Sequence, residues 1–392
     1  MKKFLALTLA LVMSLSLVAC GSKNEEPKTD DTNGTQVEEP TEGAYKIAMI
    51  TDYGDITDQS FNQTTYEACQ EFCDAEGLQF EYYKPAGDST AERVAMVDAA
   101  VADGYNVIVM PGYAFAETIK ETAELYPDVT FIALDVAQGD LGEDYTVPSN
   151  VYCAVYQEEL CGYMAGYAAV KMGYTKLGFL GGMAVPAVVR YGYGFVQGVN
   201  AAAAETGTEN VTLNYVYGGQ FFGDADITAV MDTWYQHDGV EVVFACGGGI
   251  YTSAVDAAKK ADAKVIGVDV DQAGVIANYA ETEGMTITSA MKGLYPTTYD
   301  TLSDVILNDN WSKYAGQIAT LGLVSADDPE ANYVQIPMGD GTQWCDTFTQ
   351  DDYKAMVKAM YDGELTVSND ITKSPADFAT CIAVEDQGAI KG

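Results

Sequence analysis

Basic residues are scarce in this chain of 392 residues, which has 20 Lys and Arg against 58 Asp and Glu and a formal net charge of -38. Arg93 and Arg190 are its only arginines. So acidic a chain repels nucleic-acid phosphates and lacks the electrostatic attraction that such binding depends on. We therefore expect no nucleic-acid partner.

Histidine and the common phosphate-binding motifs are also missing. His237 is the only histidine, which removes most imidazole-based catalysis and His-rich metal sites. No Walker loop occurs, and no Gly-x-Gly-x-x-Gly sequence stands at a predicted strand-to-helix turn. Asp269 and Asp271 match the spacing of a calcium loop poorly. The sequence therefore predicts neither a cofactor nor a metal.

Cysteines are present but form no recognisable framework. The chain has eight, and the seven that follow Cys20 include no Cys-x-x-Cys pair. An odd number without paired spacing argues against a zinc site or a disulfide scaffold, although one disulfide stays open. Cys246 precedes three glycines and could be imagined as a nucleophile, but it would need an activating base, and His237 is the only imidazole available. A buried cysteine at the end of a strand is the favoured interpretation.

The N-terminus has the pattern of a secretory signal: Lys2 and Lys3, a short apolar run, and small residues. Leu17-Val18-Ala19-Cys20 resembles a bacterial lipobox, so residues 1–20 are predicted to be a lipoprotein signal peptide with Cys20 as the lipidation site. The alternative is an ordinary signal peptide. Residues 21–44 are polar and acidic and should form a flexible tether. These features place the protein on the extracytoplasmic face of the cell membrane.

From Tyr45 onward, short Val- and Ile-rich runs alternate with segments of helical periodicity. Parallel neighbours need long crossovers, so this alternation predicts an α/β fold with parallel sheets. The predicted strands are Lys46–Thr51, Phe80–Lys84, Asn106–Met110, Thr130–Leu134, Lys176–Leu180, Val211–Tyr217, Glu241–Ala245, Lys264–Val268 and Met285–Ala290. Gly162 and Gly166 should allow close packing of one helix.

Polar residues and glycines follow most of these strands, where open α/β sheets bind ligands. They include Asp52, Asp135, Gly247, Gly248, Gly249, Asp269 and Lys292. Carboxylates and aromatic rings with few cations suit a neutral ligand that bears hydroxyl groups and an aromatic ring. Each position alone could merely end a strand or cap a helix.

Several motifs together resemble the basic membrane protein family of ABC-transporter solute-binding lipoproteins, the purine nucleoside receptor A-like proteins. They are Asp58-Gln59-Ser60-Phe61-Asn62-Gln63, Gly112-Tyr113-Ala114-Phe115, Gly178-Phe179-Leu180-Gly181-Gly182, Ile266-Gly267-Val268-Asp269-Val270-Asp271-Gln272 and Thr288-Ser289-Ala290-Met291-Lys292, within about 45–305. The resemblance implies two Rossmann-like lobes joined by a hinge, as in type I periplasmic-binding proteins. It also implies delivery of a nucleoside, most simply a purine, to an ABC permease and ATPase.

By the same resemblance, Phe61 and either Phe221 or Phe222 would sandwich the base. Asp52, Asn62 and Asp135 would contact its edge, and Asp269, Lys292 and the backbone of Gly247 and Gly248 would hold the ribose. Each has an alternative: Phe61 could be a core residue, Asp52 or Asn62 a cap, and Lys292 a salt-bridge partner. The family usually has an acid where this chain has Thr57, which leaves the base preference open.

We assign one lobe to residues 45–150 plus 274–308, and the other to 151–273 plus 310–392. The turn-rich sequence of residues 314–350 predicts hairpins at the edge of a lobe. The expected molecule is a monomeric, non-enzymatic receptor. The alternatives are a nucleoside- or sugar-processing hydrolase that uses Asp269 or Asp271, and a sensor or adhesin with the same fold.

Overall fold

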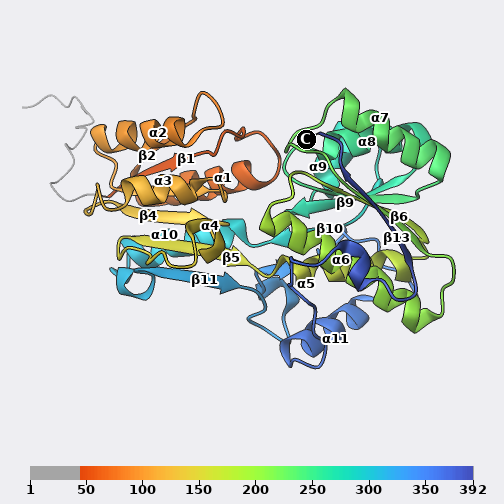
Figure 1. Ribbon diagram of the computed structural model, residues 1–392. Coiled ribbons are helices and arrows are strands. Elements are labelled where there is room, and N and C mark those ends of the chain that lie inside the picture. Colours follow the sequence, from red (N-terminus) through yellow and green to blue (C-terminus); the bar gives the residue numbers. More distant parts are fainter. Residues whose placement is uncertain (1–44, 392) are drawn as a thin grey trace, which may run out of the picture. The chain divides into compact units, whose positions relative to one another are not determined.

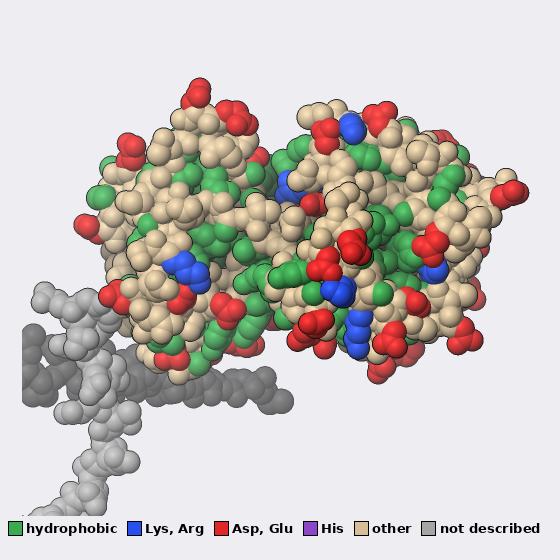
Figure 2. Space-filling view, turned by 90° about the horizontal axis from the view of Figure 1, so that it is seen from below, with side chains coloured by type: hydrophobic (Ala, Val, Ile, Leu, Met, Phe, Trp, Pro, Cys, Tyr) green, Lys and Arg blue, Asp and Glu red, His purple; other side chains and the backbone are tan. Residues whose placement is uncertain are grey.

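The computed structural model describes residues 45–391. The predicted signal peptide, the tether and Cys20 lie outside these residues. Within 45–391, no helix combines the length and the apolar character needed to cross a membrane. Figure 2 shows acidic side chains scattered over the visible face of the molecule, with fewer lysines and arginines between them.

The first sheet has six parallel strands in the order β11-β5-β4-β3-β1-β2 (Figure 1). Its strands are β1 (Lys46–Ile50), β2 (Gln79–Tyr83), β3 (Val107–Pro111), β4 (Thr130–Leu134), β5 (Val151–Tyr156) and β11 (Gln317–Leu321). Its helices are α1 (Phe61–Glu76), α2 (Thr90–Ala102), α3 (Phe115–Thr122), α4 (Gln138–Leu141) and α10 (Leu294–Ile306). Successive strand residues point to opposite faces. Accordingly, Met49 belongs to a core with α1 and α10, and Ile50 to a core with α2 and α3.

The second sheet has seven strands in the order β12-β10-β9-β8-β6-β7-β13, and only the pairing of β12 with β10 is antiparallel. Its strands are β6 (Lys176–Gly181), β7 (Thr212–Tyr217), β8 (Val242–Cys246), β9 (Lys264–Asp269), β10 (Thr286–Lys292), β12 (Val334–Gln335) and β13 (Ala383–Ala389). Its helices are α5 (Glu158–Lys171), α6 (Pro186–Thr206), α7 (Ala225–Thr233), α8 (Tyr251–Ala261), α9 (Ala273–Ala280) and α11 (Gln350–Tyr361). Short helical turns are Trp234–Asp238, Trp311–Lys313, Pro329–Ala331 and Pro375–Phe378.

Glycines bring α5 and α6 together, as the sequence predicted. A Cβ atom at Gly162 would overlap the backbone carbonyl of Tyr191, and one at Gly166 would overlap that of Phe195. Only glycine therefore allows the two backbones to approach so closely. This contact brings Arg190 and Tyr191 of α6 close to Glu158 at the start of α5.

The strand membership of the two sheets differs from the predicted division of the chain. The chain passes from the first sheet to the second after β5, returns after β10, and leaves again after β11. Residues 274–292 therefore continue the second sheet, whereas 151–156 and 317–321 belong to the first. The β9-α9-β10 unit explains this, because a crossover helix returns the chain to a neighbouring parallel strand of the same sheet.

The strands of 314–350 do not form the expected hairpins, although Cys345 and Phe348 make a local antiparallel bridge. β11 pairs with β5 and β12 pairs with β10, so the two strands belong to different sheets. The turn-rich sequence between them is the third connection between the sheets. Strand pairing across so long a separation in sequence leaves no local signal.

Candidate functional site

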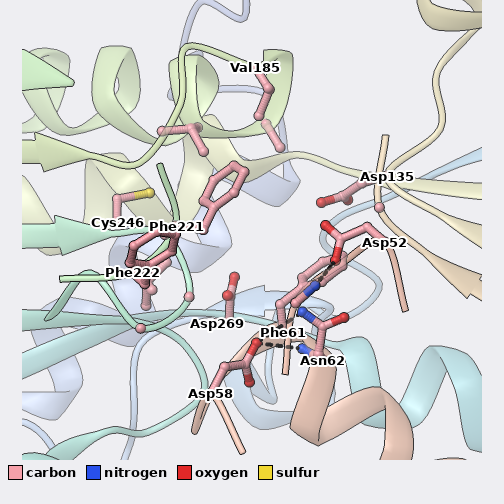
Figure 3. Close-up of a pocket in the computed structure, with 18 of the residues that line it drawn as sticks. Asp52, Asp58, Phe61, Asn62, Asp135, Val185, Phe221, Phe222, Cys246 and Asp269 are labelled. Carbon is pink, nitrogen blue, oxygen red and sulfur yellow. Dashed lines mark hydrogen bonds between the residues drawn. The ribbon is translucent and has the colours of Figure 1, made fainter. Parts of the chain in front are cut away.

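One cavity of about 410 Å³ lies where the carboxyl ends of the strands of both sheets meet (Figure 3). All ten of the described residues predicted to bind the ligand line it: Asp52, Phe61, Asn62, Asp135, Phe221, Phe222, Gly247, Gly248, Asp269 and Lys292. Strand ends supply the charged residues, α1 supplies Phe61 and Asn62, and the connection after β7 supplies the other two rings. The sequence thus predicted which residues come together, and their individual roles stay predictions.

Aromatic rings stand on opposite sides of this cavity. Figure 3 shows Phe61 on the side of α1, and Phe221 and Phe222 across the open space from it. A Cβ atom at Gly182 would collide with the Phe221 ring, and one at Gly247 would lie 3.0 Å from it. Phe222, by contrast, is 54% exposed. Phe221 is therefore the ring that its surroundings hold more closely, and which of the two rings stacks on a ligand stays a prediction.

The start of α1 is organised by Asp58, a residue that the sequence analysis did not assign to the site. Its carboxylate accepts hydrogen bonds from the backbone N–H groups of Ser60 (2.9 Å), Asn62 (2.9 Å) and Gln63 (3.1 Å), and from Asn62 Nδ2 (3.1 Å). This capping fixes the amide of Asn62. Asn62 Oδ1 is buried and has no hydrogen-bond partner among the described residues. It is an unused acceptor at the cavity.

Asp52 is held in a similar way at the end of β1. Its Oδ1 accepts hydrogen bonds from the backbone N–H groups of Tyr53 (2.7 Å) and Gly54 (2.8 Å). Burial raises the pKa of its carboxyl, and the two backbone donors and Arg93 oppose that rise. The bonds made by Oδ1 fix the orientation of the carboxyl group that lines the cavity.

An ionic cluster borders the cavity through Asp135 and Lys292. Lys292 Nζ donates to Asp135 Oδ2 (2.6 Å) and lies 3.4 Å from Glu158 Oε1, while Arg190 Nε donates to Glu158 Oε2 (2.6 Å). Burial raises the pKa of Asp135 to about 6 although Lys292 opposes the rise, and the nearby carboxylates raise the pKa of Lys292 despite its burial. Lys292 thus is a salt-bridge partner, as the alternative interpretation held, and also lines the cavity.

Asp269 ends β9 inside the same cavity. Its Oδ2 accepts a hydrogen bond from Ser60 Oγ (2.6 Å) and its Oδ1 accepts one from the Tyr191 hydroxyl (3.3 Å). Asp269 has φ 65° and Asp135 has φ 60°, both in the left-handed region. Such backbone strain at non-glycine residues concentrates at functional sites. Burial raises the pKa of Asp269 as well, against the effects of Lys292 and Ser60.

The sequence carried a local signal for one of the site residues that were not predicted, and none for the others. Asp58 stands in the quoted Asp-Gln-Ser-Phe-Asn motif, and its place before a helix was a local signal for a cap. Glu158 and Arg190 carry no local signal, because their role depends on the contact between α5 and α6. Cys246 is buried and its pKa is raised well above the usual value by that burial, as expected for a cysteine at a strand end.

The cysteines, possible metal-binding clusters and His237 are the remaining candidates for a chemical role. The seven cysteines within 45–391 are all unpaired. In the same residues, no cluster of three or more His, Cys, Asp or Glu side chains could hold a metal ion. His237 lies in the turn Trp234–Asp238 and not at the cavity.

A family model described as ABC transporter substrate-binding protein PnrA-like matches residues 45–326. Similar proteins include the ABC transporter nucleoside-binding protein BmpA of Lactococcus lactis subsp. cremoris, 26% identical over 69% of this chain and 75% of that protein. Basic membrane protein B of Borreliella afzelii is 28% identical over 71% of this chain and 78% of that protein. An uncharacterized lipoprotein of Pyrococcus horikoshii is 26% identical over 74% of this chain and 70% of that protein.

Solved structures share the fold. An ABC transporter system solute-binding protein from Aeropyrum pernix K1 has a TM-score of 0.63 and 21% identity, over 85% of this chain and 90% of that chain. One from Conexibacter woesei has a TM-score of 0.61 and 23% identity, over 83% of this chain and 99% of that chain. The chain thus shares its α/β fold with solute-binding proteins of known structure.

Proposed function

Because the chain belongs to the Bmp family of PnrA-like ABC transporter substrate-binding proteins, we propose that its cavity binds a nucleoside, and most simply a purine nucleoside. The observation that carries the proposal is the placement of Phe61 and Phe221 on opposite sides of a cavity of about 410 Å³. Two rings so placed can stack on both faces of one base, and each stack contributes about 1–3 kcal/mol.

The polar atoms around the rings favour a ligand rich in hydrogen-bond donors. Asn62 Oδ1 and Asp135 Oδ1 are buried and accept no hydrogen bond from the described residues. Unpaired buried acceptors are costly, so a ligand that supplies N–H or O–H groups gains from meeting them. The edge of a base and the vicinal hydroxyls of ribose both offer such groups, the latter to Asp269.

The charges at the cavity favour a nucleoside over a nucleotide. Its two lining lysines already have carboxylate partners: Lys292 contacts Asp135 and Glu158, and Lys84 contacts Asp55. A phosphate would meet four carboxylates of the first sheet, Asp52, Asp55, Asp58 and Asp135, without an arginine fork to bind it. The ligand class that fits is therefore neutral.

Membership of the family supports a receptor that hands its ligand to a permease and an ATPase. We propose that the protein acts in this way as a monomer, anchored to the extracytoplasmic face of the membrane by lipid on Cys20. Several relatives carry the name lipoprotein. The proposal involves no cofactor and no chemical conversion of the ligand.

The hydrolase alternative depends on Asp269 or Asp271. Asp269 is engaged with Ser60 and Tyr191, and Asp271 Oδ1 accepts a hydrogen bond from the Ala273 N–H (3.1 Å). Asp271 is not among the residues that line the cavity. This placement disfavours a pair of carboxylates acting on one ligand. The sensor or adhesin alternative differs only in its partners, and a permease that binds the liganded protein would decide against it.

Isothermal titration calorimetry tests the proposal on the chain from Gly21, freed of ligand by unfolding and refolding. The panel contains purine and pyrimidine nucleosides, free bases, nucleotides and pentoses. We expect one nucleoside class to bind, and Phe61→Ala to raise its Kd by about tenfold to hundredfold through the lost stack. Phe80→Ala is the matched control, since Phe80 contacts Tyr66 away from the cavity. If the folded protein binds nothing in the panel, the proposal is wrong.

A further inference from the structure

The C-terminal strand β13 lies beyond residues 45–326, which the family model matches. It adds an edge strand to the second sheet, parallel to β7, with Ala383 opposite Thr212 and Ala389 opposite Tyr217. Figure 1 shows this dark-blue segment running along the sheet and ending beside α7. The same end of β7 leads into residues 218–224, which carry Phe221 and Phe222. We call residues 218–224 the aromatic loop.

The end of the chain contacts the aromatic loop directly. The N–H of Ile390 donates to the carbonyl of Tyr217 (2.8 Å). Lys391 Nζ donates to the Asp224 carboxylate and to Gln220 Oε1 (3.2 Å). Gly219 has φ 83°, and a Cβ atom there would lie only 2.7 Å from the Lys391 carbonyl oxygen. The backbone and side chain of Lys391 are thus both seated on this loop.

Two further contacts anchor the strand before Lys391. Gln387 Oε1 accepts a hydrogen bond from Nε1 of the buried Trp234 (3.1 Å). Ile390 packs against the core that contains Ile227 and Ile250. The backbone that carries the Lys391 side chain is therefore held in place by the residues before it.

Gln220, which accepts a hydrogen bond from Lys391, is itself bonded to the backbone of Phe222. Gln220 Nε2 donates to the Phe222 carbonyl (2.9 Å) and to Asp224 Oδ2 (2.9 Å). Asp224 Oδ1 caps α7 by accepting from the N–H groups of Asp226 (3.0 Å) and Ile227 (3.0 Å). Without the ammonium group, Asp224 and Asp226 would lose the cation they share, which lies 3.8 Å from Asp226. Gln220 would then have one fewer restraint.

We propose that Lys391 is a positioning residue that orders the aromatic loop and so holds the ring of Phe221 ready to stack on the ligand. It touches no ligand itself. The consequence for affinity depends on the proposed nucleoside function, whereas the ordering of the loop does not. Two measurements on the same variants separate these two parts.

The test compares Lys391→Met with Lys391→Arg and with Lys373→Met. Lys373 is the matched control because it lies in the same C-terminal segment and forms an exposed ion pair with Asp370 (3.8 Å) away from the cavity. Amide hydrogen exchange is followed in ligand-free protein for peptides that cover 218–226 and, separately, 212–217. The Kd for the bound nucleoside of the calorimetry panel is measured on the same proteins.

We expect Lys391→Met to accelerate exchange in 218–226 about two- to fivefold and to raise the nucleoside Kd by a similar factor, as a partly exposed ion pair allows. Exchange in 212–217 should stay unchanged, Lys391→Arg should behave like the unchanged protein, and Lys373→Met should have no effect. Unchanged exchange in 218–226, or equal acceleration along β7, would overturn the proposal by showing a merely structural edge strand. Faster loop exchange with an unchanged Kd would overturn its link to binding. If no nucleoside binds, the exchange result still decides the ordering role.

Discussion

The two sides of the cavity differ in chemistry. The first sheet contributes four carboxylates, Asp52, Asp55, Asp58 and Asp135, together with Asn62 and Phe61. The second sheet contributes small and apolar side chains, the glycines after β8 and the cation Lys292, with Asp269 as its single carboxylate at the cavity among the described residues. One side therefore offers hydrogen-bond acceptors, and the other offers a close backbone surface and the Phe221 ring. A ligand therefore obtains the full binding energy that the cavity offers only when it contacts both sides.

Direct contacts already join these two sides. Lys292 of β10 bonds to Asp135, which follows β4, Ser60 donates to Asp269 (2.6 Å), and Gln272 Nε2 donates to the Gln59 carbonyl (3.1 Å). Each of these pairs has one member on each side. The protein's own groups thus stabilise the arrangement that surrounds the cavity.

The largest loss of stability is expected from a substitution that removes the ionic contact between the two sides. In Lys292→Met the buried Asp135 loses its partner and Glu158 keeps only Arg190, so the free energy of unfolding should fall by about 3–5 kcal/mol. Urea denaturation measures this. Lys313→Met is the control, because the Lys313 side chain is 60% exposed in its pair with Asp304 and should cost no more than about 1 kcal/mol. Equal losses for both variants would show that the cluster does not stabilise the fold.

The next prediction concerns the carboxyl group of Glu159, in the first turn of α5. Glu159 is buried, its Oε2 has no hydrogen-bond partner among the described residues, and burial raises its pKa to about 7. The native state therefore binds a proton more tightly than the unfolded chain. By linkage, this group's contribution lowers stability as pH rises from about 4.5 to about 7.

Glu159→Gln removes that ionisation. The variant and the unchanged protein should have equal stability near pH 4, and the variant should be more stable by up to about 3 kcal/mol above pH 7. Thermal and urea unfolding across this pH range measure the difference. Glu385→Gln, at an exposed position on β13, is the control and should show no such divergence. A constant difference at all pH values would contradict the assigned pKa.

The sequence predicted more of the site than of the chain's path. All nine predicted strands match observed ones, and carboxyl ends of parallel strands meet at one edge of a sheet, so Asp52 and Asp135 had to share the edge of the first sheet. Asp269 ends a strand of the second sheet and joins them because both sheets border the cavity. The missed strands β5, β11, β12 and β13 lie where the chain leaves a sheet or at a sheet edge. Which sheet β5 and β11 join depends on long-range pairing, whereas the β9-α9-β10 crossover was a local signal that residues 274–292 stay in the second sheet.

The side-chain network was predictable only in part. Asp135 and Lys292 were both recognised as strand-end charges, and a salt bridge was among the alternatives for Lys292. Glu158 and Arg190 complete that cluster only because α5 and α6 approach closely through Gly162 and Gly166. Helix packing of this kind brings together residues that share no sequence motif. The identity of the residues therefore emerged from the sequence, and their pairing did not.

The smallest expected effect tests the single carboxylate of the second side. Asp269→Asn keeps an oxygen that can accept from Ser60 or Tyr191 but removes the negative charge. A charged hydrogen bond is roughly twice as strong as a neutral one, so the nucleoside Kd should rise about tenfold while the fold is retained. Removing a buried carboxylate whose pKa is raised by burial should leave the free energy of unfolding unchanged or slightly higher. Calorimetry and urea denaturation measure the two quantities.

Asp271→Asn is the matched control, two residues further along and outside the cavity, and should leave Kd within about twofold. The pair also distinguishes a receptor from a hydrolase. A receptor returns its nucleoside intact from both variants and from the unchanged protein, and only Kd differs among them. Release of free base or pentose by the unchanged protein, lost in either variant, would assign chemistry to these carboxylates. In that case the second side would act on the ligand, and the division of labour between the two sides would be that of an enzyme.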